Sequence, residues 1–197
     1  RPGYDIGAVT TGIVHLGLGA FHRAHQAVYT DAILRDDPRW GVCGVSLKTP
    51  RVIAALTPQD GLYTVLAKGA EGTSARVIGA VREMLFLGQQ RDRVIARIAD
   101  PAVRIVSLTV TEKGYCHDPA TGRLDPAHAE IAHDLARPEA PISTIGVLAA
   151  GLAARLDFTI DDIEDLRIAA GEAGALVLPE ADPDSDLICE FFLKPGE

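Results

Sequence analysis

A glycine-containing turn between two apolar patterns is the first feature of the sequence that could bind a ligand. Residues 17–19 read Gly-Leu-Gly, directly after the short buried-strand pattern Ile13–Leu16 and before the helical spacing of apolar residues in 21–34. Glycines in such a turn let a pyrophosphate approach the backbone, and the start of the helix adds N–H donors and a positive dipole end. The placement therefore predicts that Gly17 and Gly19 contact a dinucleotide.

Polar residues follow at once in the predicted helix. His22 stands where a third glycine or alanine is usual in such turns, and Arg23 either pairs with a phosphate or forms a surface ion pair. His22 and His25 lie three residues apart, which is a spacing that can hold a metal, but no Glu or Cys stands near in sequence to complete the ligands. We therefore expect packing or phosphate contacts here, and no metal site.

A second group of polar residues ends the clearest strand pattern, Val103–Val110. Ligands of open α/β sheets lie at the carboxyl ends of the strands. Thr109, Thr111 and Glu112 are therefore predicted to face the cofactor. Lys113, in the same stretch, is either a proton donor or a solvated loop residue.

The residues after the second strand pattern, 41–47, bear on the choice of cofactor. The acidic residue that would hold the ribose 2′-hydroxyl of NAD is missing there. Lys48 and Arg51 stand nearby, and they either face the 2′-phosphate of NADP or lie solvated in a loop. The sequence leaves the choice between NAD and NADP open.

Strand and helix patterns alternate along residues 1–155, and these elements must position the polar residues above. One antiparallel hairpin interrupts the alternation, with strands at 62–67 and 75–87 around a turn at 68–73. The predicted fold class is α/β, a Rossmann-like and mostly parallel sheet with an antiparallel hairpin insertion, plus a short acidic helix-strand tail. The expected strands of the sheet are 13–16, 41–47 and 103–110, and the expected helices are 21–34, 51–56, 90–99, 126–136 and 143–155.

The composition is that of a globular protein and argues against several classes of function. Apolar residues make up 47% and charged residues 23%, and no apolar run reaches the ~18 residues of a membrane span. The net charge of −8 argues against an electrostatic grip on nucleic acid. Three widely spaced cysteines predict neither a disulfide framework nor a zinc site, and favour a reducing cytoplasm. The chain opens on Arg1 without a secretory signal, which suggests a trimmed or partial chain.

The charge divides the chain near residue 155. Residues 1–155 carry a net charge of +2 and all six histidines, whereas residues 156–197 carry a net charge of −10. We therefore expect a dinucleotide-binding domain at 1–155 and an acidic segment of different character at 156–197. Within that segment we expect one helix over 160–178 and one later strand.

Five motifs between residues 10 and 155 occur in the order that a known family shows. They are Ile13–Leu34 (IVHLGLGAFHRAHQAVYTDAIL), Trp40–Val52 (WGVCGVSLKTPRV), Pro58–Leu66 (PQDGLYTVL), Arg104–Cys116 (RIVSLTVTEKGYC) and His133–Leu152 (HDLARPEAPISTIGVLAAGL). These motifs resemble the polyol-specific long-chain dehydrogenases. That family includes mannitol 2-dehydrogenase, fructuronate reductase (mannonate oxidoreductase) and tagaturonate reductase.

The resemblance implies an oxidoreductase of carbohydrate metabolism, which passes hydride between NAD and a polyol or keto sugar acid. By it, Gly17, Gly19, Phe21 and Arg23 would lie against the cofactor, the TEKGY loop would line the nicotinamide side, and no metal would be used. The family's catalytic lysine belongs to a helical C-terminal domain whose motifs do not occur in these 197 residues. We therefore expect a cofactor-binding domain without its catalytic lysine, and we assign no catalytic residue.

The acidic segment resembles a different protein class. Its stretch DDIEDLRIAAGEA is similar to part of an anti-sigma factor with the histidine-kinase-like ATPase fold, in which Glu172 would fall in a nucleotide-site helix. On the residues alone, Glu172 is an exposed helix residue rather than a polar group facing a nucleotide pocket. The alternative function is therefore a regulatory module that binds a protein partner or a nucleotide through residues 156–197.

Overall fold

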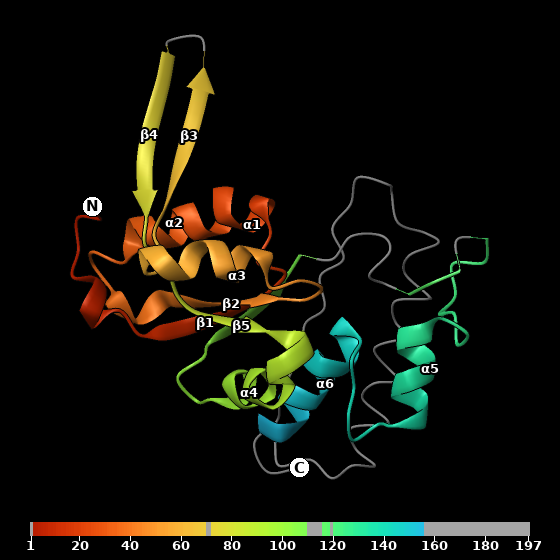
Figure 1. Ribbon diagram of the computed structural model, residues 1–197. Coiled ribbons are helices and arrows are strands. Elements are labelled where there is room, and N and C mark those ends of the chain that lie inside the picture. The colour runs from red at the N-terminus through yellow and green to blue at the C-terminus, as the bar shows by residue number, and fades with distance from the viewer. Residues whose placement is uncertain (1, 70–71, 110–115, 119, 156–197) are drawn as a thin grey trace.

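Four parallel strands form the central sheet, in the order β5-β2-β1-β6 (Figure 1). The computed structural model describes residues 2–69, 72–109, 116–118 and 120–155. The chain builds from β1 outward in one direction through β2 and β5, then crosses back to add β6 on the opposite side of β1. The direction of strand addition therefore reverses between β1 and β6. The bounds are β1 Thr11–Leu16, β2 Gly41–Ser46, β5 Val81–Phe86 and β6 Ile105–Leu108.

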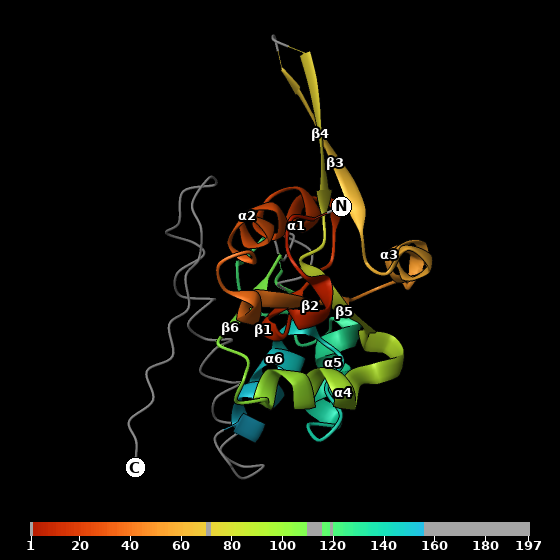
Figure 2. The ribbon, with the colours of Figure 1, turned by 90° about the vertical axis from the view of Figure 1, so that its left-hand side faces the viewer.

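Helices cover both faces of this sheet, as the two views show (Figures 1 and 2). Helices α1 (Ala20–Ala24), α2 (Gln26–Ile33) and α3 (Arg51–Leu56) lie on one face, and α4 (Leu87–Ala99) and α6 (Thr144–Arg155) on the other. Because helices cover the sheet from both sides, its two central strands, β1 and β2, are buried along almost their whole length. The predicted α/β, Rossmann-like class is confirmed.

Successive side chains of the strands fill two separate cores. Ile13 points to the α1–α2 face, where it packs with residues such as Leu18, Ala27 and Val42. Val14 and Leu16 belong to the core on the α4–α6 face, which also holds Val94, Ile98 and Val147. Both strand residues and helix residues in these cores are almost fully buried, which fixes β1 and its following turn from two sides.

The helix predicted over 21–34 is interrupted at His25, which has φ −123° and ψ −88°. The backbone N–H of His25 bonds to the carbonyl of His22, at 3.3 Å. The carbonyl of Phe21, which that N–H would take in an unbroken α-helix, is instead 2.8 Å from Nδ1 of the His25 ring. The ring therefore replaces the backbone at this carbonyl, and the segment forms the two helices α1 and α2.

The predicted hairpin is present, but its second run is two strands rather than one. Strands β3 (Tyr63–Gly69) and β4 (Gly72–Ile78) pair antiparallel and project from the body (Figure 1). The chain then bends at Gly79, whose N–H donates to Oδ1 of Asp31 at 2.8 Å, and continues as β5 of the parallel sheet. A Cβ at Gly79 would lie 2.9 Å from Cγ of Pro2, so the bend lies in a crowded place.

Asp31 joins three parts of this face, although its carboxylate is almost fully buried. Besides the N–H of Gly79, it accepts hydrogen bonds from the hydroxyl of Tyr4 and, at 2.8 Å, from Nη2 of Arg76 on β4. Burial and the neighbouring carboxylate raise the pKa of Tyr4 above its ordinary value, so Tyr4 stays a donor. A buried carboxylate is tolerable only with such partners. The N-terminal segment, α2 and the hairpin therefore meet at this residue.

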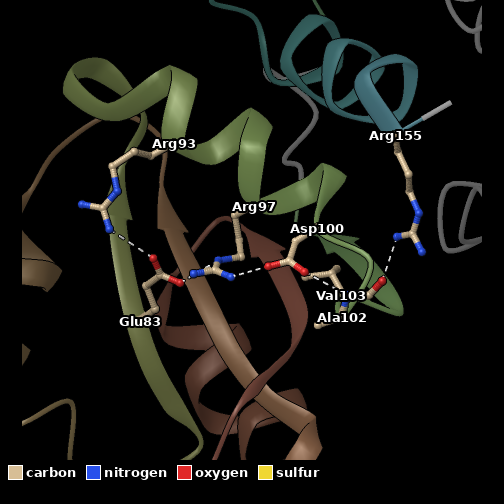
Figure 3. A network of polar contacts seen from close by, with 7 residues as sticks. All are labelled: Glu83, Arg93, Arg97, Asp100, Ala102, Val103 and Arg155. Atoms are coloured by element: carbon tan, nitrogen blue, oxygen red, sulfur yellow. Dashed lines mark hydrogen bonds and ion pairs between the residues drawn. The ribbon is translucent and has the colours of Figure 1, made fainter. Parts of the chain in front are cut away.

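On the opposite face, a chain of ion pairs holds α4 against the sheet (Figure 3). Glu83 of β5 pairs with Arg93 at 3.3 Å and with Arg97 at 2.8 Å, and Arg97 also pairs with Asp100 at 2.7 Å. Arg155, the last residue of α6, donates to the carbonyl oxygen of Val103 at 2.7 Å. These contacts fix the segment that leads into β6.

Other boundaries differ modestly from the predicted ones. Helix α4 begins at Leu87 rather than at 90, with an irregular residue at Gln90, whose side chain accepts the N–H of Phe86. Strand β6 has four residues instead of the eight predicted for 103–110. Helix α5 (Ala129–Ala136) starts three residues later than expected. The helix and strand predicted within 156–197 lie outside the described residues.

Candidate functional site

The reversal of strand order brings the carboxyl ends of β1 and β6 side by side. Leu16 is in register with Leu108, and the N–H of Thr109 donates to the carbonyl of Leu16 at 2.9 Å. The connections leaving these two strands diverge at such a point, and this opens the crevice in which open α/β sheets bind ligands. Gly17 and Thr109, the next residue of each strand, therefore lie together at the carboxyl ends of β1 and β6.

Gly17 adopts a backbone conformation that requires glycine. Its φ is +109°, and a Cβ at this position would lie 2.9 Å from the carbonyl oxygen of Thr109. The N–H groups of Gly17 and Leu18 both donate to the carbonyl of Val45 on β2, at 2.9 Å. The turn is therefore held between β2 on one side and the residue after β6 on the other.

Leu18 and Gly19 divide the turn into an anchored part and an open part. Leu18 is buried, and its side chain lies over Gly44, where a Cβ would come within 2.6 Å of Cδ1 of Leu18. Gly19 is exposed, and a Cβ there would meet nothing nearer than the carbonyl oxygen of Gly17 at 3.6 Å. The backbone at Gly19 is thus accessible to a ligand, which is the arrangement that a diphosphate needs.

The side chain of Arg23 stabilises the turn through a hydrogen bond. Its Nη1 donates to the carbonyl of Leu18 at 3.0 Å, and its own carbonyl accepts the hydroxyl of Tyr63 at 2.7 Å. The guanidinium has further N–H groups, so one side chain can hold the turn and still offer positive charge to an anion. Arg23 also lines a groove of about 720 Å³ between α1, α3 and β3, to which Thr49 and Arg51 contribute.

Two stacked histidines lie in the interior beneath the turn. The rings of His15 and His22 are 3.7 Å apart and only 3% and 1% of the two residues is exposed. Burial lowers the pKa of His15 to about 4 and that of His22 to about 3, so both rings are neutral at pH 7. Neither nitrogen of His22 has a hydrogen-bond partner within the described part of the chain.

His15 links β1 to β6 and α2 through its two ring nitrogens. Nδ1 lies 2.9 Å from Oγ of Ser107, which in turn donates to Oε1 of Gln26 at 3.1 Å. Nε2 lies 3.0 Å from Oγ1 of Thr109. Sequence reasoning missed His15, although a histidine inside an apolar strand is a signal that buried polar partners are needed.

Four of the predicted cofactor contacts, Gly17, Gly19, Arg23 and Thr109, lie close together at the carboxyl ends of β1 and β6. Phe21 instead lies on the outer surface, 64% exposed, with its ring stacked on His25 at 4.3 Å. His22 lies in the interior, so it packs under the turn rather than at its surface.

Three further candidates, Thr111, Glu112 and Lys113, lie outside the described residues, as does Glu172. The described residues include no group of three or more His, Cys, Asp or Glu arranged to hold a metal ion. His25 is exposed while His22 points inward, so these two do not form a pair. Across the same residues, no helix has the length and apolar character to cross a membrane.

Comparison with known proteins identifies the same domain. Residues 11–164 match the mannitol dehydrogenase Rossmann domain. The chain is 43% identical over 177 residues to D-mannonate oxidoreductase of Escherichia coli (strain K12), covering 85% of this chain and 36% of that protein. It is also 42% identical over 175 residues to mannitol 2-dehydrogenase of Cereibacter sphaeroides, again covering 36% of that protein. The chain therefore spans about a third of the length of these curated relatives.

Solved structures agree with the observed fold. Mannitol 2-dehydrogenase of Pseudomonas fluorescens, in a ternary complex with NAD and D-mannitol, superposes with a TM-score of 0.75 at 35% identity, over 90% of this chain and 40% of that one. A D-sorbitol dehydrogenase in substrate-free form gives a TM-score of 0.76 at 32% identity, over 91% of this chain and 42% of that one.

Proposed function

Because this chain belongs to the mannitol dehydrogenase family through its Rossmann domain, we propose that it binds NAD across the crevice between β1 and β6. The observation that carries the proposal is the turn at Gly17–Gly19, which stands at the reversal of strand order with an exposed glycine backbone. The Pseudomonas fluorescens relative of the same fold is bound to NAD. A titration with NADH tests the proposal directly.

Each part of the dinucleotide has a place suggested by the surrounding residues. The diphosphate lies over Gly17 and Gly19, with the guanidinium of Arg23 beside it. The adenosine half extends towards the end of β2 and the groove lined by Thr49 and Arg51. The nicotinamide half extends towards Thr109 on the other side of the reversal. Phe21, Thr111 and Glu112 remain predicted contacts of this site, whereas the buried ring of His22 supports the turn from the interior.

The proposed reaction class is hydride transfer between a nicotinamide cofactor and a polyol or keto sugar acid. NAD supplies the hydride chemistry when it is bound, and this chain holds and orients it. The mannitol and mannonate enzymes that it resembles suggest the substrate class. The chain spans about a third of the length of these relatives, and the residues proposed here bind the cofactor rather than catalyse the reaction.

The choice of cofactor rests on the residues after β2. No acidic side chain follows Ser46 closely, and Arg51 lines the groove where the adenosine ribose would lie. We propose NAD as the cofactor. We expect NADP to bind as well, with an affinity that the same titration can measure, because the guanidinium of Arg51 can pair with a 2′-phosphate. Parallel titrations with NADH and NADPH separate the two.

A second function is proposed for the acidic segment at 156–197, on the observation of its net charge of −10. We propose that it is a unit distinct from 1–155 and that it binds a basic protein partner. Limited proteolysis followed by mass spectrometry tests the division, because a boundary near 155 predicts early cleavage there.

We propose that the protein is located in the cytoplasm, on the basis of its three widely spaced cysteines.

A further inference from the structure

The donor and the acceptor can be assigned in each hydrogen bond around His15, and the series of bonds ends at Thr109, beside the glycine turn. Ser107 uses its hydroxyl hydrogen to donate to Oε1 of Gln26, so its oxygen can only accept from Nδ1 of His15. Nδ1 of His15 therefore carries the proton. Because the ring is buried and neutral, Nε2 has no proton and must accept from Oγ1 of Thr109.

The hydroxyl hydrogen of Thr109 is consequently already used in the hydrogen bond to His15. The hydroxyl donates to His15, and its oxygen keeps lone pairs that can accept a hydrogen bond from a further partner. Thr109 is half-buried. A Cβ built on Gly17 would lie 3.5 Å from the Cβ of Thr109, so the side chain of Thr109 lies next to the glycine turn. A ligand group that meets this oxygen must bring its own hydrogen.

We infer that His15 is a positioning residue that makes Thr109 an obligatory hydrogen-bond acceptor, and that Thr109 thereby selects the carboxamide N–H of a nicotinamide over a carboxylate. The inference rests on the proposed function, because it assumes that the nicotinamide half of the dinucleotide lies on the β6 side. The stack of His22 on His15 holds the ring in this orientation, at a centroid distance of 3.7 Å.

The proton position in His15 is measurable without any cofactor. Long-range ¹H–¹⁵N correlation spectra of the ¹⁵N-histidine-labelled chain distinguish a protonated ring nitrogen from an unprotonated one, and His15→Phe assigns the signal. We expect the Nδ1–H form of a neutral ring near pH 7. An Nε2–H form reverses the direction of every bond in the series and overturns the inference.

The selectivity is measured with NAD and its deamido analogue, nicotinic acid adenine dinucleotide, which carries a carboxylate in place of the carboxamide. We expect the wild type to bind NAD about tenfold more tightly than the analogue. The Thr109 oxygen and the carboxylate of the analogue are both acceptors, so no hydrogen bond can form between them. Thr109→Val should bring the ratio of the two dissociation constants close to one. Thr109→Ser, which keeps the hydroxyl, should restore it.

His15→Phe separates positioning from a structural role. The variant keeps an aromatic ring against His22 but releases the hydroxyl of Thr109, which can then rotate and donate to a carboxylate. We expect the NAD preference to disappear although Thr109 is intact. An equal loss of affinity for both ligands, with the ratio preserved, overturns the inference.

The outcomes also separate this inference from the proposed function. If the wild type binds neither dinucleotide, the proposed function fails, and the ¹⁵N spectrum still decides the proton position. If His15→Phe does not fold, Ser107→Ala removes the acceptor of Nδ1–H instead. That variant should weaken the NAD preference, and an unchanged preference contradicts the inference.

Discussion

A Cβ on residue 17 would lie 2.9 Å from the carbonyl oxygen of Thr109, so Gly17 and Thr109 can be this close only because residue 17 has no side chain. The contact joins the ends of two strands that are far apart in sequence and adjacent in the sheet. It packs the glycine turn directly against the end of β6. Any side chain here must push β6 away from the turn or strain the backbone.

The first prediction compares two glycines of the same turn. Gly17→Ala combines a φ of +109° with the contact to Thr109, and should lower the free energy of unfolding by about 1–3 kcal/mol. Gly19→Ala is the matched control, because φ at Gly19 is −89° and its nearest contact is at 3.6 Å. Urea unfolding of both variants provides the measurement. Equal effects at the two positions would contradict the role given to Gly17.

The second prediction concerns acid stability. The folded-state pKa values of His15 and His22, about 4 and about 3, lie below the ordinary value of 6.5. The unfolded chain therefore binds more protons than the native one below about pH 6.5, and the free energy of unfolding should fall as the pH drops from there towards 4. Each of the two rings should account for a loss of about 3 kcal/mol between pH 6.5 and pH 4.

His22→Phe isolates this contribution, because it keeps a ring on His15 and removes one titrating group. Chemical unfolding at pH 7, 6, 5 and 4 should show a shallower decline for the variant than for the wild type. His128→Asn is a control outside the stacked pair, because it removes a titrating ring but keeps a side-chain acceptor at the N-cap of α5. Parallel declines in His22→Phe and wild type would show that the stacked pair does not carry the effect.

The third prediction concerns Asp31. Asp31→Ala leaves the N–H of Gly79 buried without its acceptor and removes the partner of Arg76, so it should cost about 3 kcal/mol of stability. Asp31→Asn keeps one acceptor oxygen and should cost less. Asp92→Ala, at a pair whose carboxylate is 86% exposed, should change stability by under ~0.5 kcal/mol. Thermal unfolding of the three variants should rank them in that order.

Local sequence patterns predicted much of this fold, and long-range contacts explain what they missed. The buried strands at β1 and β2, the Gly-Leu-Gly turn and α3 follow from apolar runs, glycine and Pro50 placed near each other in sequence. The break between β4 and β5 depends on a hydrogen bond from Gly79 to Asp31, 48 residues away. No local sequence pattern indicates that contact, so residues 75–87 were predicted as a single strand.

The candidate site shows the same division. Gly17, Gly19 and Arg23 belong to one continuous motif and were predicted as a group. The partners of His15 come from elsewhere, since Ser107 is 92 residues away in sequence and Thr109 is 94. The interior position of His22 likewise depends on a ring contributed by β1. A contact between strands that pair across such distances is fixed by the sheet register, which a single sequence does not display.

The central claim is that the exposed turn at Gly17–Gly19 binds the diphosphate of a nicotinamide dinucleotide. Isothermal titration of NADH into the wild type and into Gly19→Asp, with Gly19→Ala as the neutral control, tests it most directly. A carboxylate at residue 19 repels the diphosphate and fills its space, so we predict binding by the wild type, near-equal binding by Gly19→Ala, and at least about tenfold weaker binding by Gly19→Asp. Equal affinity in Gly19→Asp and the wild type, or no binding by a folded wild type, would contradict the claim.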